Sequence, residues 1–204
     1  MDKDNFKKAL IGSNDLEQFY EEYLHGNEIW YLSEFLAVEN PSKRYDQIKV
    51  MIARRLNLSA NEIVIVGSAK LGFSITPRPK KMFRDFCSVH PDEKEISDID
   101  MGIVNAELFN KLWKAYYDLH YSKGLPWGEY NYLSKNIFKK FLMINSEIRG
   151  HTILEEWFKR IEPCVKDLQT LYGINHNVNY RVYESWDAMK NYHIAGLSLL
   201  KKTM

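Results

Sequence analysis

This chain is poor in the features that mark secreted, membrane-spanning and disordered proteins. Its two cysteines, Cys87 and Cys164, are too few for a disulfide framework, and nothing else in the sequence indicates an oxidising compartment. No apolar run approaches the roughly 20 residues that a membrane helix requires. The charged stretch from Met1 to Lys8 lacks the apolar segment of a secretory signal. We therefore expect a cytoplasmic protein with no membrane partner.

Apolar and aromatic residues are plentiful enough to build a large core. The chain has 204 residues, of which 45% are hydrophobic, and it contains 13 tyrosines, 10 phenylalanines and 5 tryptophans. This composition excludes an intrinsically disordered chain. The length favours a single domain over residues 1–204, with at most a small helical appendage.

The net charge of +1 hides an uneven distribution along the chain. The first 40 residues carry nine acids and three bases, and the remaining residues carry an excess of seven bases. A basic C-terminal part is compatible with a polyanionic partner such as a nucleotide or a nucleic acid. An unevenly charged solvated surface has the same composition, so both interpretations stay open.

Helical spacing dominates the first part of the chain. Apolar residues three and four positions apart predict a helix that Asn14 caps and Gly26 ends. Asn40 followed by proline is typical of an N-cap and the first helical position, and the pattern continues to Leu56. We therefore expect residues 1–57 to form N-terminal helices.

Short runs of apolar and β-branched residues, in contrast, predict strands. The three runs are 62–66, 98–104 and 178–183. Between and after them the spacing becomes helical again, and Pro163 predicts a kink or break in the longest helical stretch. These helical stretches begin after Asn105, after residues 124–128, at His151 and after Ser185.

A few strands among many helices indicate the α/β class in its α+β form. We expect a small mixed β-sheet flanked by many helices. Residues 62–104 would carry the chemical motifs of the domain, and residues 105–204 would supply helices and one further strand.

Asp98 and Asp100 are the strongest candidates for a functional site. Because side chains alternate along a strand, the two carboxylates leave the same face, and Gly102 leaves space beside them. Two like charges a few ångströms apart repel unless a cation lies between them. A hard divalent cation such as Mg²⁺ or Mn²⁺ is the expected occupant. The alternative is a pair of solvated acids on an edge strand.

A second candidate element is the Gly67-Ser68 pair at the end of the first apolar strand. Glycine lets the backbone approach a phosphate closely, and free N–H groups with a hydroxyl can bind it. Lys70 follows the turn and is a candidate to reach a bound triphosphate. The alternatives are an ordinary strand-ending turn and a surface lysine.

Together these elements resemble the nucleotidyltransferase superfamily, whose fold is named after DNA polymerase beta, and in particular its small stand-alone bacterial members. The resemblance rests on Ile-Val-Ile-Val-Gly67-Ser68-Ala-Lys-Leu-Gly72 and on Ser-Asp98-Ile-Asp100-Met. It covers roughly residues 62–104. The remainder of the chain is similar only in its general pattern of helices and one later strand.

The resemblance implies an enzyme that transfers a nucleoside monophosphate from a nucleoside triphosphate to an acceptor hydroxyl and releases pyrophosphate. It implies that Asp98 and Asp100 bind two Mg²⁺ or Mn²⁺ ions and that Gly67 and Ser68 hold the terminal phosphates. The family has a third carboxylate on a later strand, for which Glu184 is the candidate here. The acceptor stays open among RNA, a protein, a small molecule and another nucleotide.

In a second hypothesis, the chain has the same fold and binds a nucleotide but does not catalyse its transfer. The 29 residues between Ser68 and Asp98 form a long insertion, and Arg181 rather than an acid stands in the middle of the last strand. The chain would then be a catalytically weak or inactive nucleotide sensor, or an interaction partner of another protein in a toxin–antitoxin or phage-defence module.

The insertion carries four cations with no acid near them until Asp85. They are compatible with phosphate contacts to a nucleotide or to RNA, and equally with a mobile, solvated loop. Phe83 and Phe86 are compatible with stacking on a base, although anchoring of the segment to the core is the simpler interpretation. The four cations are Arg78, Lys80, Lys81 and Arg84.

Overall fold

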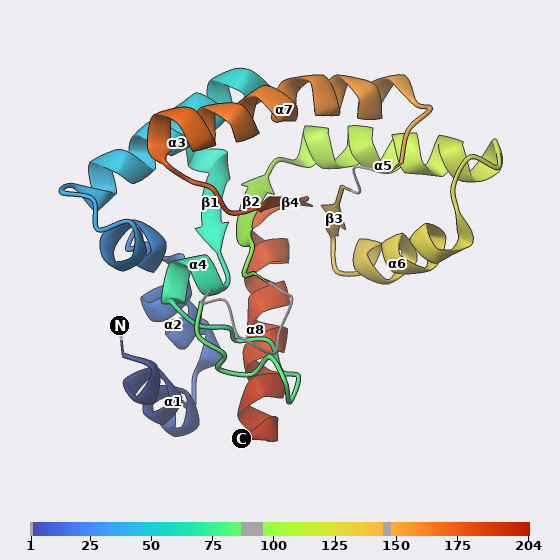
Figure 1. Cartoon of the computed structure of the whole chain (residues 1–204). Helices are drawn as coiled ribbons and strands as arrows, with labels where there is room; N and C mark the ends of the chain where they lie inside the picture. Colours follow the sequence, from blue (N-terminus) through green and yellow to red (C-terminus); the bar gives the residue numbers. More distant parts are fainter. Residues whose placement is uncertain (1, 87–95, 145–147) are drawn as a thin grey trace.

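A mixed four-stranded β-sheet lies at the centre of the protein (Figure 1). The computed structural model describes residues 2–86, 96–144 and 148–204. The strand order is β1-β2-β4-β3, in which β2 is antiparallel to β1 and parallel to β4, and β3 is antiparallel to β4. The predicted mixed α/β class is therefore confirmed. The strands are β1 (Ile63–Val66), β2 (Ile99–Val104), β3 (Phe141–Met143) and β4 (Val178–Tyr183).

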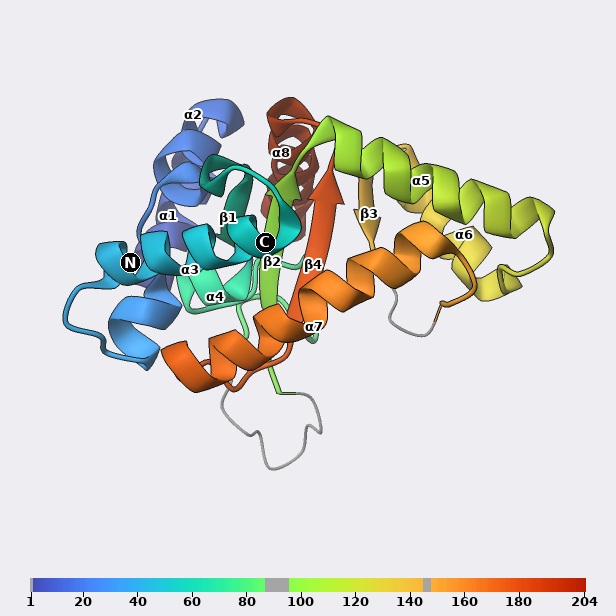
Figure 2. The same ribbon diagram turned by 90° about the horizontal axis from the view of Figure 1, so that it is seen from above.

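Three long helices cover one face of the sheet, as the view from above shows (Figure 2). Their apolar sides meet alternate strand residues, among them Ile65, Met101 and Val182. Because side chains alternate along a strand, this face takes only every second residue and is almost wholly apolar. The helices are α3 (Pro41–Leu56), α5 (Ala106–Tyr121) and α7 (Thr152–Tyr172).

The opposite face of the sheet carries the other set of strand residues and a second, smaller core. In Figure 1, α8 runs away from the sheet beside α1 and α2. Phe6 and Leu10 of α1 are buried there together with Leu197 of α8. The three helices are α1 (Lys3–Gly12), α2 (Leu16–Tyr20) and α8 (Trp186–Thr203).

Shorter elements connect these layers. The helix α6 (Trp127–Ile137) packs against β3 at one end of the sheet. Two π-helical segments follow α2, a 3₁₀ turn precedes β1, and a single helical turn follows it. These are η1 (Glu21–His25), η2 (Tyr31–Phe35), η3 (Ala60–Glu62) and α4 (Ser68–Leu71).

Side-chain caps fix the starts of the helices at predicted positions. The Asn40 carboxamide accepts a hydrogen bond from the Lys43 N–H at 3.0 Å, and Asn105 accepts one from Leu108 at 2.7 Å. Such caps satisfy backbone donors that the first helical turn leaves without a partner. The cap of α2 differs from the prediction, because Asp15 and not Asn14 accepts hydrogen bonds from the first turn.

Two further details differ from the expectations. The helix α7 runs from Thr152 to Tyr172 without a break at Pro163. The strand β3 was not expected, because three residues carry too little alternation to be recognised. The insertion 69–97 is described only in part: residues 87–95, and with them Cys87, lie outside the described residues.

None of the helices in the described ranges combines the length and the apolar character that crossing a membrane would need.

Candidate functional site

The Gly67-Ser68 turn and the two aspartates lie next to each other in the structure. Val66, the last residue of β1, pairs with Asp100 of β2. A Cβ atom added to Gly67 would lie 3.0 Å from Oδ2 of Asp100, and the Gly67 φ of 69° is in the region that favours glycine. The close approach therefore requires a residue without a side chain. Two motifs separated by the long insertion form one site.

The aspartates share their face of the sheet with two residues of β4. Asp100 pairs with Asn179 and Gly102 pairs with Arg181 in the parallel register. The Asn179 amide donates a hydrogen bond to Oδ2 of Asp98 at 3.1 Å. Asp98 directly precedes β2, and this bond fixes its carboxylate although the residue lies outside the strand. The predicted common face of the two acids is thus present.

Arg181 forms an ion pair with Asp100. Its Nη2 lies 3.1 Å from Oδ1 of Asp100, and its Nη1 donates to the Tyr192 hydroxyl of α8 at 3.1 Å. The side chains of Arg181 and Asp100 are 22% and 21% exposed, so the pair is largely shielded from water. Burial raises the pKa of the Asp100 carboxyl, and the positive charge of Arg181 opposes that rise. One of the two acids therefore already has a fixed counter-ion.

The two carboxylates provide ligands for one hard cation but not a complete set for two. Within the described ranges, no three histidine, cysteine, aspartate or glutamate side chains gather where a metal ion could bind. Oδ1 of Asp98 and Oδ2 of Asp100 are the carboxylate oxygens that neither Asn179 nor Arg181 engages. A single Mg²⁺ or Mn²⁺ shared by these two carboxylates fits the chemistry of the site.

Glu184 is not brought together with the aspartates. It follows the last residue of β4, and its carboxylate binds Nζ of Lys140 at 2.6 Å. Asp100 pairs with Asn179, five residues earlier on the same strand. At the rise of a β-strand, this separation corresponds to about 16 Å. The residue expected to complete the carboxylate set therefore lies at the other end of the sheet.

Lys70 is also engaged elsewhere. Its side chain is buried, and Nζ donates hydrogen bonds to the carbonyl oxygens of Gly26 and Glu28. Burial lowers the pKa of this amine to about 8. The expected contact between Lys70 and a triphosphate would require both backbone contacts to break. Its position in the structure ties the start of the insertion to the N-terminal segment.

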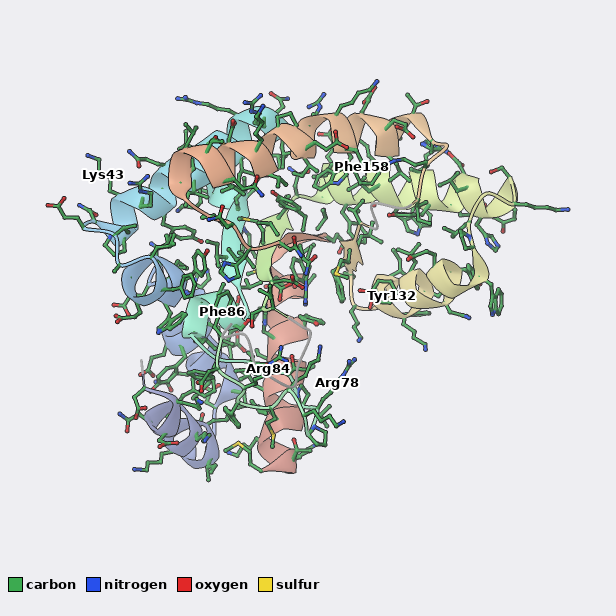
Figure 3. All side chains as sticks on the ribbon, in the orientation of Figure 1. Lys43, Arg78, Arg84, Phe86, Tyr132 and Phe158 are labelled. Carbon is green, nitrogen blue, oxygen red and sulfur yellow. The ribbon has the colours of Figure 1, made fainter. Side chains whose placement is uncertain are left out.

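The aromatic residues of the insertion anchor it to the core, as the simpler interpretation predicted. Phe86 is buried and packs against Trp30 and Tyr31 at ring-centroid distances of 5.9 and 5.4 Å. Figure 3 shows Arg78 and Arg84 below the sheet, at the level of α8. The described part of the insertion is thus held to the core by its aromatic rings.

The sequence analysis placed Arg181 in the last strand where an acid was expected, but it predicted neither its ion pair with Asp100 nor any part for Asn179 in the site. Asn179 and Arg181 are two positions apart on β4, and their side chains leave the same face of the sheet as those of Asp98 and Asp100. That signal becomes usable only when β4 is known to lie beside β2, and the order of strands is not encoded in local spacing. The hydrogen bond between Tyr192 of α8 and Arg181 could not be predicted from the local sequence around Tyr192.

Comparisons of the chain with protein-family models, with curated proteins and with solved structures give no match. The site is therefore interpreted from its own geometry and chemistry.

Proposed function

We propose that the chain is a Mg²⁺-dependent nucleotidyltransferase that moves a nucleoside monophosphate from a nucleoside triphosphate to an acceptor hydroxyl. The observation that carries the proposal is the contact between the two motifs: the Cβ position of Gly67 lies 3.0 Å from the Asp100 carboxylate. A phosphate group at the Gly67-Ser68 backbone would be adjacent to a cation held by the aspartates. Phosphoryl and nucleotidyl transfer depend mainly on such positioning and charge neutralisation.

Each residue of the site has a defined part in this proposal. Gly67 and Ser68 bind the terminal phosphates through backbone N–H groups and the hydroxyl. Asp98 and Asp100 would hold the divalent cation, which supplies charge neutralisation at the phosphates. Asn179 and Arg181 fix the orientations of the two carboxylates before the ligand binds. The acceptor hydroxyl would belong to RNA, a protein, a small molecule or another nucleotide.

The double substitution Asp98→Asn/Asp100→Asn tests the proposal. We expect it to abolish Mg²⁺-dependent binding of a non-hydrolysable triphosphate in calorimetry, and transfer of label from an α-labelled triphosphate, because two neutral amides lack the negative charge that holds a divalent cation at this site. Glu184→Gln is the control: it removes an acid that binds Lys140 instead, so binding and transfer should stay at the wild-type level. Transfer by the double variant at the wild-type rate would contradict the assignment.

A second candidate function is favoured by the ion pair between Arg181 and Asp100. A site with one acid neutralised, and with no third carboxylate among the residues that the structure describes, is suited to hold a nucleotide without turning it over. The chain would then be a nucleotide sensor or an interaction partner that uses the same site. Binding of a triphosphate with Mg²⁺, without release of pyrophosphate over prolonged incubation, would favour the sensor over the enzyme.

A further inference from the structure

A cavity of about 680 Å³ lies along the outer edge of β4. It is lined by Val178, Asn179 and Tyr180, three consecutive residues of this strand. Because consecutive side chains point to opposite faces of a sheet, all three can line one cavity only if it follows the edge of the strand. Among the described residues, the pairing of the neighbouring β3 with β4 ends with Met143 opposite Arg181, before Tyr180 is reached.

The walls of the cavity are mainly apolar and aromatic. Trp157 and Phe158 come from α7, and Trp157 meets the ring of Tyr180 edge-on at 6.0 Å. The Arg149 guanidinium lies 3.8 Å from the ring centroid of Phe158. Figure 3 shows Phe158 below α7 and Tyr132 on α6, the two helices that border this edge. Volume and lining are those of a site for a small organic ligand.

One residue joins this cavity to the acid pair. Asn179 lines the cavity, and its amide donates to Asp98 at 3.1 Å. Across this end of the sheet, the order is therefore Gly67 after β1, the two aspartates on β2, Asn179 on β4, and then the cavity. The cavity and the phosphate-binding turn lie on opposite sides of the aspartates.

We propose that this cavity holds the nucleoside of the triphosphate, with its base between the aromatic walls. The proposal rests on the proposed function, because it takes the terminal phosphates to lie at Gly67-Ser68 and the α-phosphate to lie at the aspartates. The nucleoside is attached to the α-phosphate on the side opposite the terminal phosphates. In the order of elements across the sheet, that side is the edge of β4 that the cavity follows.

The chemistry of the lining favours the base over the phosphates. Planar bases stack on aromatic rings and on guanidinium groups, and Trp157, Phe158 and Arg149 offer both. Two acids, Glu129 and Glu162, line the cavity beside the single cation Arg149, so the charge of the lining does not attract a polyphosphate. A neutral base meets no net repulsion there, and this difference favours the direction of binding that we propose.

Filling the cavity tests this inference. Val165 lines the cavity from α7 and is half-buried, so Val165→Trp adds a large ring there. The probes are the four ribonucleoside triphosphates and inorganic tripolyphosphate, each titrated with Mg²⁺ by calorimetry. In the wild type, at least one nucleotide should bind more tightly than tripolyphosphate. The substitution should weaken that nucleotide about tenfold or more and leave tripolyphosphate affinity unchanged.

Two controls make each outcome decisive. Leu171→Trp places the same ring at a 62% exposed position of α7 outside the cavity and should leave all affinities unchanged. If Val165→Trp does not fold by circular dichroism, Val178→Phe fills the same space from β4. Unchanged nucleotide affinity in a folded cavity variant would overturn the inference alone. Failure of the wild type to bind any nucleotide or tripolyphosphate would overturn the proposed function as well.

Discussion

At the scale of single residues, Arg181 is the feature that separates this site from the one that the resemblance implies. It projects from β4 onto the face of the two aspartates, and it neutralises Asp100 across 3.1 Å. Keeping a buried acid charged without a metal costs less folding free energy when the acid already has a counter-ion. We therefore expect the wild-type protein to fold without added cation and to depend on Mg²⁺ mainly when a triphosphate is bound.

Arg181→Glu is expected to convert the site into one that needs a cation. The substitution would place a third carboxylate beside Asp98 and Asp100 and remove the positive charge, so repulsion would destabilise the folded state. Mg²⁺ binds the folded state of such a cluster and should raise its free energy of unfolding, through ligand linkage, by roughly 1–3 kcal/mol more than in the wild type. Urea denaturation without Mg²⁺ and with about 10 mM Mg²⁺, which is well above the roughly millimolar dissociation constants of weak divalent-cation sites, measures the difference.

Arg181→Gln separates the two effects of that substitution. It removes the positive charge without adding an acid, so its dependence on Mg²⁺ should lie between those of the wild type and Arg181→Glu. Equal stabilisation of all three proteins by Mg²⁺ would show that the charge of residue 181 does not control the cation at this site.

Individual site residues differed in how far the sequence could place them. Strand alternation was sufficient to put Asp98 and Asp100 on one face, because that rule needs no knowledge of neighbouring strands. The backbone contacts of Lys70 could not be anticipated, since Gly26 and Glu28 lie more than 40 positions away in the chain. Long-range contacts of this kind depend on how helices and strands pack, which local spacing does not specify.

At the scale of elements, the pairing of β4 with its neighbours creates both halves of the proposed site. Against β2 it brings Asn179 and Arg181 to the aspartates, and beyond the end of β3 it leaves an edge for the cavity. Strong local signals such as the Asn40 and Asn105 caps could be read from sequence. The strand β3 has three residues, too few for alternation to distinguish a strand from a loop.

The helix α8 carries His193, whose burial makes stability depend on pH. The ring stacks on Tyr20 of α2 and adjoins Tyr192, and the positive charge of Arg181 faces it from β4. Burial, together with that charge, lowers the pKa of His193 to about 4. An unfolded histidine titrates near 6.5. Between these values the unfolded chain binds a proton that the folded protein does not bind.

The sign of the effect follows from this difference in proton binding. The contribution of His193 to stability should be complete above about pH 6.5 and should fall as the pH drops toward 4, by about 2.5 kcal/mol at pH 4.5. His193→Gln cannot take up this proton. Urea denaturation at pH 7.5 and 4.5 should therefore show a larger loss of unfolding free energy in the wild type than in the variant. Equal losses would mean that His193 is protonated in the folded state.

At the scale of the whole molecule, the sheet is shared by two cores. Helices α3, α5 and α7 bury one face, while α1, α2 and α8 bury the other (Figure 1). The acidic N-terminal segment reaches the C-terminal helix through an ion pair between Glu17 and Lys190. The two ends of the chain thus stabilise the same layer. The sequence predicted helices at both ends, but not that they would pack against each other.

Because every strand contributes to both faces, we expect the two cores to unfold together. Phe6 is fully buried in the smaller core and meets the rings of Phe19 and Phe73 edge-on at 5.1 and 5.2 Å. Phe6→Ala should therefore lower the free energy of unfolding by about 3–5 kcal/mol. Ile11→Ala, at a 57% exposed position of the same helix, should change it by less than about 0.5 kcal/mol.

The measurement that tests this coupling follows both cores in one experiment. In a Trp186→Phe background, which removes the tryptophan of α8, fluorescence reports on Trp157 in the larger core, and far-ultraviolet circular dichroism follows all helices. In Phe6→Ala, both signals should shift to the same lower urea midpoint. The two cores lie on opposite faces of one sheet, so loss of the smaller core also destabilises the sheet on which the larger core packs. An early transition in circular dichroism with an unchanged fluorescence midpoint would instead show that α1, α2 and α8 unfold independently of the layer above the sheet.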